Sequence, residues 1–326
     1  MLPAKLSSLH LQLAGKYTDA AINGVLQALA ALPLLSRLFL ALSSFGAETA
    51  IDLSLLAACP SLTDLQLQTD WEGSPKLSFA QLEQVRSSLG HLQRFSAGWL
   101  HSGSLTRLLQ PPVTAQWRDI GYVYADERTG GLLLRLLSLR KLQLVQPRYT
   151  AHADFLSQLP QLTALELHCN NDQNGGWFIP ADALLASLVR CTCITELELN
   201  CGFTSAHWSA LFAKLALKTL TIRRGEIDTL RCFASGPITQ SLQELTSRDV
   251  FVLPPSELPH LYSLRRLRIL RLLNCFSPRL SDATIASLSP PTRLLPSLTS
   301  LSESHVLDKV ERRGLSWEWL QERLTH

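Results

Sequence analysis

The sequence has little charge for its length and no long apolar run. Charged residues make up 17% of the 326 positions, and 30 basic residues nearly balance 27 acidic ones. This balance argues against a nucleic-acid binder, which needs a broad basic surface to hold phosphates. No stretch reaches the roughly 18 uninterrupted apolar residues of a membrane-spanning helix. Residues 1–15 also lack the continuous apolar segment of a secretory signal. We therefore expect neither a membrane nor a nucleic-acid partner.

Cysteine is scarce and scattered. The seven cysteines are odd in number and spread along the chain, whereas a secreted disulfide scaffold packs an even set into a short sequence. The pattern predicts an intracellular protein with reduced thiols, in the cytoplasm or alternatively in the nucleus.

Familiar catalytic motifs are missing as well. The sequence has no P-loop, no His-Glu-x-x-His, no Gly-x-Ser-x-Gly and no Gly-x-Gly-x-x-Gly. Since catalytic groups can also converge from distant positions, this absence lowers the expectation of an enzyme without excluding one. We assign no catalytic residue and expect a non-enzymatic protein.

What the sequence does have is leucine, roughly a fifth of the chain, in a repeated pattern Leu-x-x-Leu-x-Leu. Leu162, Leu165 and Leu167 form one clear copy, and Trp117, Ile120 and Tyr122 form a degenerate one. The copies begin at residues 6, 35, 62, 92, 117, 139, 162, 194, 217, 242, 267 and 298. Their mean spacing is roughly 26–27 residues, within the range of about 20–29 that is typical of short solenoid repeats.

This pattern resembles the leucine-rich repeat family. The resemblance implies an α/β horseshoe solenoid, with a parallel concave sheet and helices on the convex side. Apolar residues at helical spacing in 20–31, 79–89, 181–189 and 206–215 agree with helices between the strands. One repeat cannot offset the entropy of ordering its own backbone, so stacked neighbours must share their apolar faces.

We predict one array of about twelve repeats over residues 1–304, degenerate at 92–131 and 242–249, and a C-terminal helical cap over 305–326. The residues before Leu6 offer no candidate for a cap on the first repeat, so we expect one of three arrangements there. That edge is exposed, is covered by a partner, or belongs to a longer parent chain.

Leucines of the repeat point inward, so the residues between them line the concave face. The candidate partner-binding residues there carry an acidic group followed by a basic one. They are Gln66, Gln143, Glu166, His168, Glu196, Glu198, Asn200, Arg223, Arg224, Arg248 and Arg271. The alternative is that these are ordinary solvated positions and that another surface binds.

Two further features have both a structural and a functional interpretation. The polar insertion 170–177 is a surface loop, or it presents Trp177 and Phe178 to a ligand as a binding loop. Four cysteines and one histidine could form a zinc site. They are Cys169, Cys191, Cys193, Cys201 and His168.

The cysteines favour burial over metal binding. Cys59 and Cys191 occupy a repeat position that is leucine in other copies, and free cysteine behaves as a small buried apolar residue. We therefore expect no metal and no cofactor.

The predicted function is a non-catalytic scaffold that binds a protein or peptide on its concave face. A narrower hypothesis is the substrate-recognition part of a larger adaptor. The alternative is a regulatory or catalytic repeat protein, such as a GTPase activator or a ubiquitin-ligase component. Bacterial ligases built on such repeats add a catalytic Cys-x-Asp, which this sequence lacks.

Overall fold

The structure is a computed structural model that describes residues 5–13, 17–42, 50–69, 77–110, 116–145, 154–168, 181–200, 202–223, 230–248, 260–273, 297 and 299–302. The chain divides into two compact units, Met1–Leu162 and Thr163–His326. They are called the N-terminal and the C-terminal unit below, and each is described by itself.

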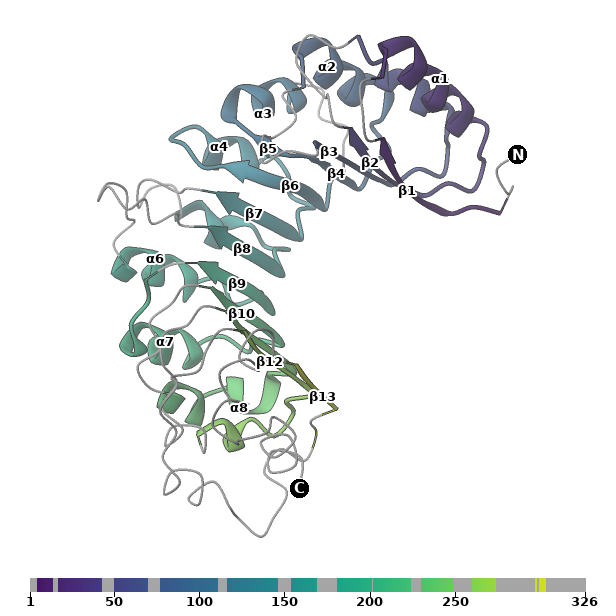
Figure 1. The fold of residues 1–326 in the computed structure, drawn as a ribbon. Helices are drawn as coiled ribbons and strands as arrows, with labels where there is room; N and C mark the ends of the chain where they lie inside the picture. Colours follow the sequence, from purple (N-terminus) through teal and green to yellow (C-terminus); the bar gives the residue numbers. More distant parts are fainter. Residues whose placement is uncertain are drawn as a thin grey trace. The chain divides into compact units, whose positions relative to one another are not determined.

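The N-terminal unit contains a parallel sheet in which successive strands pair (Figure 1). A short extra strand, β5, pairs with β6. The strands are β1 (Ser8–Leu13), β2 (Arg37–Leu42), β3 (Asp64–Thr69), β4 (Arg94–Ala97), β5 (Trp99–Leu100), β6 (Asp119–Tyr124) and β7 (Lys141–Val145).

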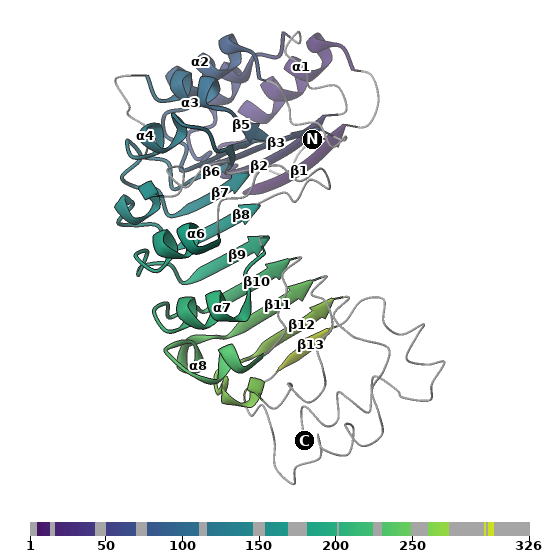
Figure 2. The same ribbon diagram turned by 90° about the vertical axis from the view of Figure 1, so that its left-hand side faces the viewer.

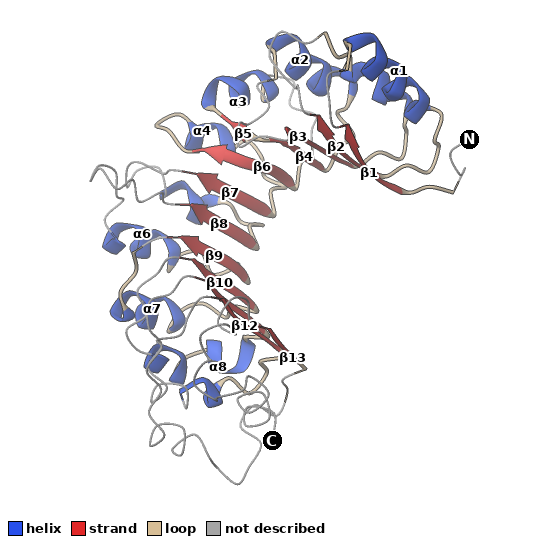
Figure 3. Ribbon diagram, viewed as in Figure 1, coloured by secondary structure: helices blue, strands red, loops and turns tan. Residues whose placement is uncertain are grey.

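Helices connect these strands and lie on one side of the sheet (Figure 3). They are α1 (Asp19–Ala30), η1 (Leu53–Ala58), α2 (Phe79–Ser88), α3 (Ser102–Leu108), α4 (Thr129–Leu133) and η2 (Phe155–Gln158). Helix α2 shows why they begin where they do. Ser78 accepts a hydrogen bond from Gln81 N, and the Gln81 side chain accepts one from Ser78 N. This capping box satisfies two backbone donors.

The C-terminal unit repeats the arrangement, and Figure 2 shows β9 to β13 side by side. Its strands are β8 (Ala164–His168), β9 (Glu196–Asn200), β10 (Thr219–Arg223), β11 (Glu244–Arg248), β12 (Ile269–Leu273) and β13 (Ser300–Ser302). Its helices are α6 (Ala181–Leu188), α7 (Ser205–Phe212), η3 (Leu230–Ala234) and α8 (Ile238–Ser241).

The repeat predicted from the sequence is confirmed. Each predicted repeat start is followed two residues later by a parallel strand. In the degenerate copy at 92, Leu92, Phe95 and Ala97 are at most 1% exposed, and in the copy at 242 Ser247 takes the last inward position at 4%. The four predicted helices form as α1, α2, α6 and α7. The fold is that of an α/β leucine-rich-repeat solenoid, held together by aliphatic side chains worth about 1.5–3 kcal/mol each when buried.

One repeat departs from the predicted register. Gly121 has a φ of +67°, and the pairing of β6 with β7 shifts between Asp119 and Tyr122. As a result Val123, not Tyr122, occupies the third core position of this repeat, at 0% exposure. The predicted inward position of Tyr122 is therefore wrong, because a β-bulge inserts one extra residue.

The predicted cap at 305–326 lies outside the described residues. Within the described ranges, none of the helices combines the length and apolarity required to cross a bilayer.

Candidate binding face of the sheet

The sheet of each unit has an open face, which we define as the face opposite its helices. Strand residues alternate between the two faces, so the outward side chains of neighbouring strands form rows across the open face. In β9 the inward Leu197 and Leu199 are at most 2% exposed, while Glu198 and Asn200 between and after them are half-buried. The same alternation runs through β10 and β11.

One such row crosses five strands of the C-terminal unit, and we call it the charged row. Strand pairing aligns its members directly, one from each strand. From β8 to β12 it consists of Glu166, Glu198, Thr221, Thr246 and Arg271. The acidic end predicted from the sequence and the basic end therefore belong to one continuous line of side chains.

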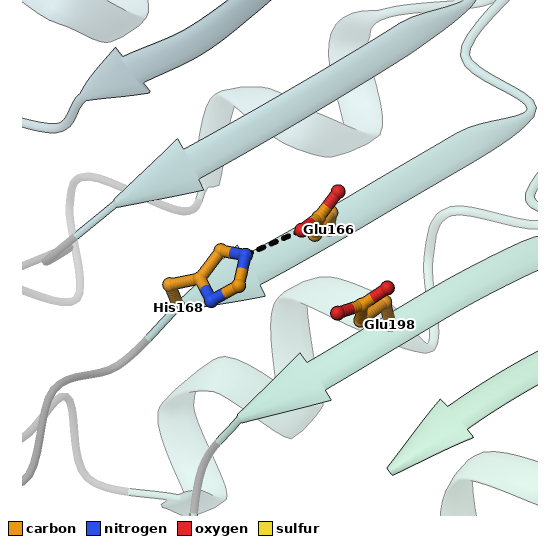
Figure 4. Close-up of side chains that lie close together, drawn as sticks. All are labelled: Glu166, His168 and Glu198. Carbon is orange, nitrogen blue, oxygen red and sulfur yellow. Dashed lines mark hydrogen bonds and ion pairs between the residues drawn. The ribbon is translucent and has the colours of Figure 1, made fainter. Parts of the chain in front are cut away.

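At the acidic end of the charged row, three predicted site residues converge (Figure 4). A hydrogen bond of 2.5 Å joins His168 Nε2 to Glu166 Oε1. One donor atom each from Glu166, His168 and Glu198 lies within 4.8 Å of the others. Glu166 is 8% exposed, and the side chains of His168 and Glu198 are 19% and 21% exposed. In the described part of the chain, these residues form the group of donor atoms that could hold a metal ion.

Arg223 of β10 joins this group through an ion pair of 2.5 Å between its Nε and Glu198 Oε1. The guanidinium offsets the repulsion between Glu166 and Glu198, which are directly opposite each other on neighbouring strands. Like charges placed this way are otherwise destabilising.

The basic end is more accessible to solvent. Arg248 of β11 is exposed and is aligned with Arg223. Arg271 lies 3.9 Å from Glu244 Oε2 through its Nη1, and both side chains are 41% exposed. An ion pair this long and exposed is weak, so Arg271 can leave Glu244 for an anionic group of a partner. Arg248 lies in the row next to the charged row and is itself exposed.

The remaining predicted site residues are not all part of this arrangement. Gln66 and Gln143 belong to the N-terminal unit. Gln66 donates to Asp64 Oδ1 at 3.2 Å, and Gln143 is only 8% exposed. Glu196 is exposed on β9, one row away from the charged row. Arg224, Trp177 and Phe178 lie outside the described residues.

The sequence analysis missed a second line of charge, on the N-terminal unit. The first outward position of strands β2, β3, β4, β6 and β7 carries alternating signs. Its members are Arg37, Asp64, Arg94, Asp119 and Lys141. Arg94 bridges Asp64 at 3.5 Å and Asp119 at 3.0 Å. All five residues stand just before the second apolar residue of their repeats, so a comparison of that position across the repeats would have predicted this line of charge.

The cysteines behave as the burial interpretation expects where they are described. Cys59 and Cys191 are buried, and Cys193 is exposed. Burial raises the pKa of the Cys191 thiol to about 11, which disfavours the thiolate form that binds metals. Cys169 and Cys201 lie outside the described residues.

Comparisons with known proteins give distant likenesses only. No protein-family model matches the chain, and no curated protein matches it. Among solved structures, the TLR13–ssRNA13 complex matches 84% of this chain and 40% of that chain, with 16% identity and a TM-score of 0.43. A leucine-rich-repeat protein of Leptospira interrogans matches 85% of this chain and 62% of its own, with 17% identity and a TM-score of 0.38. The chain thus spans less than two thirds of either protein, and these likenesses indicate no ligand for it.

Proposed function

We propose that this repeat scaffold is a non-catalytic binding protein, which takes a protein or peptide on the open face of its C-terminal unit. The observation that carries the proposal is the charged row, in which Glu166 and Glu198 stand at one end and Arg271 at the other. In a longer parent protein, such a face would act as the substrate-recognition part of an adaptor.

The geometry specifies the kind of partner. Neighbouring strands are about 4.7–4.9 Å apart, so Glu198 and Arg271, three strands apart, are separated by roughly 14–15 Å across the sheet. A partner with a basic group and an acidic group at that separation matches both ends. Complementary charges of this kind raise the association rate and fix the orientation of the complex more than they raise affinity.

The outward residues of the charged row are distinct from the inward residues that form the core. The inward Leu220 and Leu245 of β10 and β11 are at most 2% exposed and belong to the core, whereas the outward Thr221 and Thr246 between the charged ends are half-buried. Short polar side chains at the centre leave a shallow polar strip that a peptide backbone can approach.

The test is a charge reversal at the accessible basic end. A variant with Arg248→Glu and Arg271→Glu is compared with a control that carries Arg190→Glu and Lys214→Glu. The control residues are exposed and lie shortly after the ends of helices α6 and α7. Both variants change the formal net charge by the same amount, and thermal unfolding checks that both fold.

Partners captured by the wild-type protein are identified, and the dissociation constant of each is measured with purified components. We expect the open-face variant to bind at least about tenfold more weakly, because like charges that face each other across an interface cost several kcal/mol. The control is expected to bind as the wild type does. Equal affinities for both variants would show that the partner binds elsewhere.

A further inference from the structure

The acidic end of the charged row holds donor atoms of two chemical kinds at one point. Glu166 and His168 are two residues apart on β8, which places them on the same face of the strand. Pairing of β8 with β9 then puts Glu198 directly beside Glu166. Figure 4 shows the imidazole and both carboxylates turned toward one another above the two strands.

The donor set suits a divalent transition metal. One imidazole nitrogen and two carboxylate oxygens are ligands of Zn²⁺, and an imidazole distinguishes the set from the all-oxygen sites of Mg²⁺ and Ca²⁺. Tetrahedral Zn²⁺ with bonds of about 2.0–2.2 Å separates its ligand atoms by about 3.4 Å. The donor atoms here lie within 4.8 Å of one another, and terminal torsions of the glutamates can bring them to that spacing because those torsions are soft.

The hydrogen bond of His168 with Glu166 shows how an ion would enter. The two atoms are 2.5 Å apart, so they must separate to the roughly 3.4 Å of two Zn²⁺ ligands when an ion enters. An ion between them takes the place of the bridging hydrogen, which moves to the other ring nitrogen or is released to solvent, so that Nε2 presents its lone pair.

We propose that Glu166, His168 and Glu198 form a binding site for a divalent transition metal, with Zn²⁺ as the best-matched ion. The site is on the open face, so a fourth coordination position points away from the sheet, where water or a donor atom from a partner can take it. The site uses the acidic end of the charged row, and a bound ion would offset its two carboxylate charges, but the test below concerns the ion alone and needs no protein partner.

Arg223 provides a test that distinguishes metal binding from general damage to the sheet. Its guanidinium pairs with Glu198 Oε1 and so places a positive charge next to the three candidate ligands. A cation bound here is repelled by Arg223. Replacing this arginine with neutral glutamine is therefore expected to strengthen metal binding, the opposite of what general damage to the sheet would do.

The experiment is calorimetric titration of the purified, metal-free chain with ZnCl₂, repeated with CoCl₂, whose visible absorption reports the ligand geometry. Four variants are compared with the wild type: His168→Ala, Glu166→Gln with Glu198→Gln, Arg223→Gln, and Cys193→Ser. The last removes an exposed thiol that can bind zinc by itself, and it serves as the control.

We expect one Zn²⁺ per chain, an affinity at least about 100-fold weaker in His168→Ala and in the double glutamine variant, and an affinity several-fold tighter in Arg223→Gln. The control should bind as the wild type does. Thermal unfolding with and without Zn²⁺ gives a second readout, since an ion that binds the folded state raises Tm in the wild type and not in His168→Ala.

Three results would overturn the proposal: no saturable binding by the wild type, equal binding by the wild type and His168→Ala, or loss of binding only in Cys193→Ser. If metal binding persists while the Arg248/Arg271 reversal leaves partner affinity unchanged, the metal site stands and the proposed protein-binding face fails.

Discussion

Gly121 and Gly24 should respond to the same substitution with opposite signs. Gly121 has a φ of +67°, and a Cβ added there would lie 2.4 Å from Ser96 Oγ, 2.8 Å from Ser96 Cβ and 3.0 Å from Ser96 Cα. Gly24 is within helix α1, and its Cβ would meet nothing within 4 Å. Both residues belong to the N-terminal unit.

The magnitudes follow from these two environments. At Gly121, a left-handed backbone costs an alanine about 1–2 kcal/mol, and overpacking against Ser96 costs about 1–3 kcal/mol. Alanine also restricts the unfolded chain, which stabilises the folded protein by about 0.4–1 kcal/mol. Gly121→Ala should therefore lower the free energy of unfolding by about 2–4 kcal/mol. Gly24→Ala should raise it by about 0.8–1 kcal/mol, the difference in helix propensity between the two residues.

Equilibrium urea unfolding followed by far-UV circular dichroism measures both changes. A double variant, Ser96→Gly with Gly121→Ala, removes the two nearest contacts of the new Cβ but leaves the backbone strain. The loss of unfolding free energy caused by Gly121→Ala should therefore be roughly half as large in the Ser96→Gly background as in the wild type. A Gly121→Ala protein within about 0.5 kcal/mol of the wild type, or no recovery in the double variant, would refute the bulge as the cause.

Three more substitutions test the packing and the caps. Trp208, fully buried 5.2 Å from Phe203 and 5.5 Å from Phe212 between ring centroids, should cost about 3–5 kcal/mol of unfolding free energy when changed to alanine; a loss below about 1 kcal/mol in urea would contradict this packing. Ser78→Ala removes the cap of α2 and should cost about 1 kcal/mol, whereas Ser78→Asp, which can also cap, should unfold at nearly the wild-type urea midpoint. Burial raises the pKa of Asp126, but hydrogen bonds from Ser102 and Thr129 outweigh it and hold the pKa below its ordinary value. The stability from this carboxylate is therefore present above about pH 4 and lost as pH falls through its folded pKa; thermal unfolding from pH 7 to pH 2 should show the wild type losing its advantage over Asp126→Asn, and a constant difference would contradict the assignment.

The sequence predicted the repeat well because the pattern is built from local spacing. Leu165 and Leu167 must point to the same side once the strand forms, and each repeat then aligns with the next through its own leucines. The outward neighbours Glu166 and Glu198 follow from that register, and so the acidic and basic ends of the charged row could be predicted before the structure.

What the spacing could not supply was the detailed pairing of side chains. His168 was predicted on the concave face together with Glu166, but as a metal ligand it was considered only with the cysteines, whereas in the structure it contacts Glu166. The alternating charges around Arg94 were missed because the position before the second leucine was considered at Glu196 but not compared across the repeats of the N-terminal unit.

The amino-acid sequence by itself determined the period of the chain, its inward and outward positions, and the order of charges along the open face, because all of these depend on residues a few places apart. The tertiary structure alone decided where the period is broken at Gly121, how deeply Glu166 and Gln143 are buried, and that Arg223 pairs with Glu198. These features arise from packing between residues far apart in the sequence. The repeat pattern allows several side-chain arrangements, and contacts with the neighbouring strands select one of them.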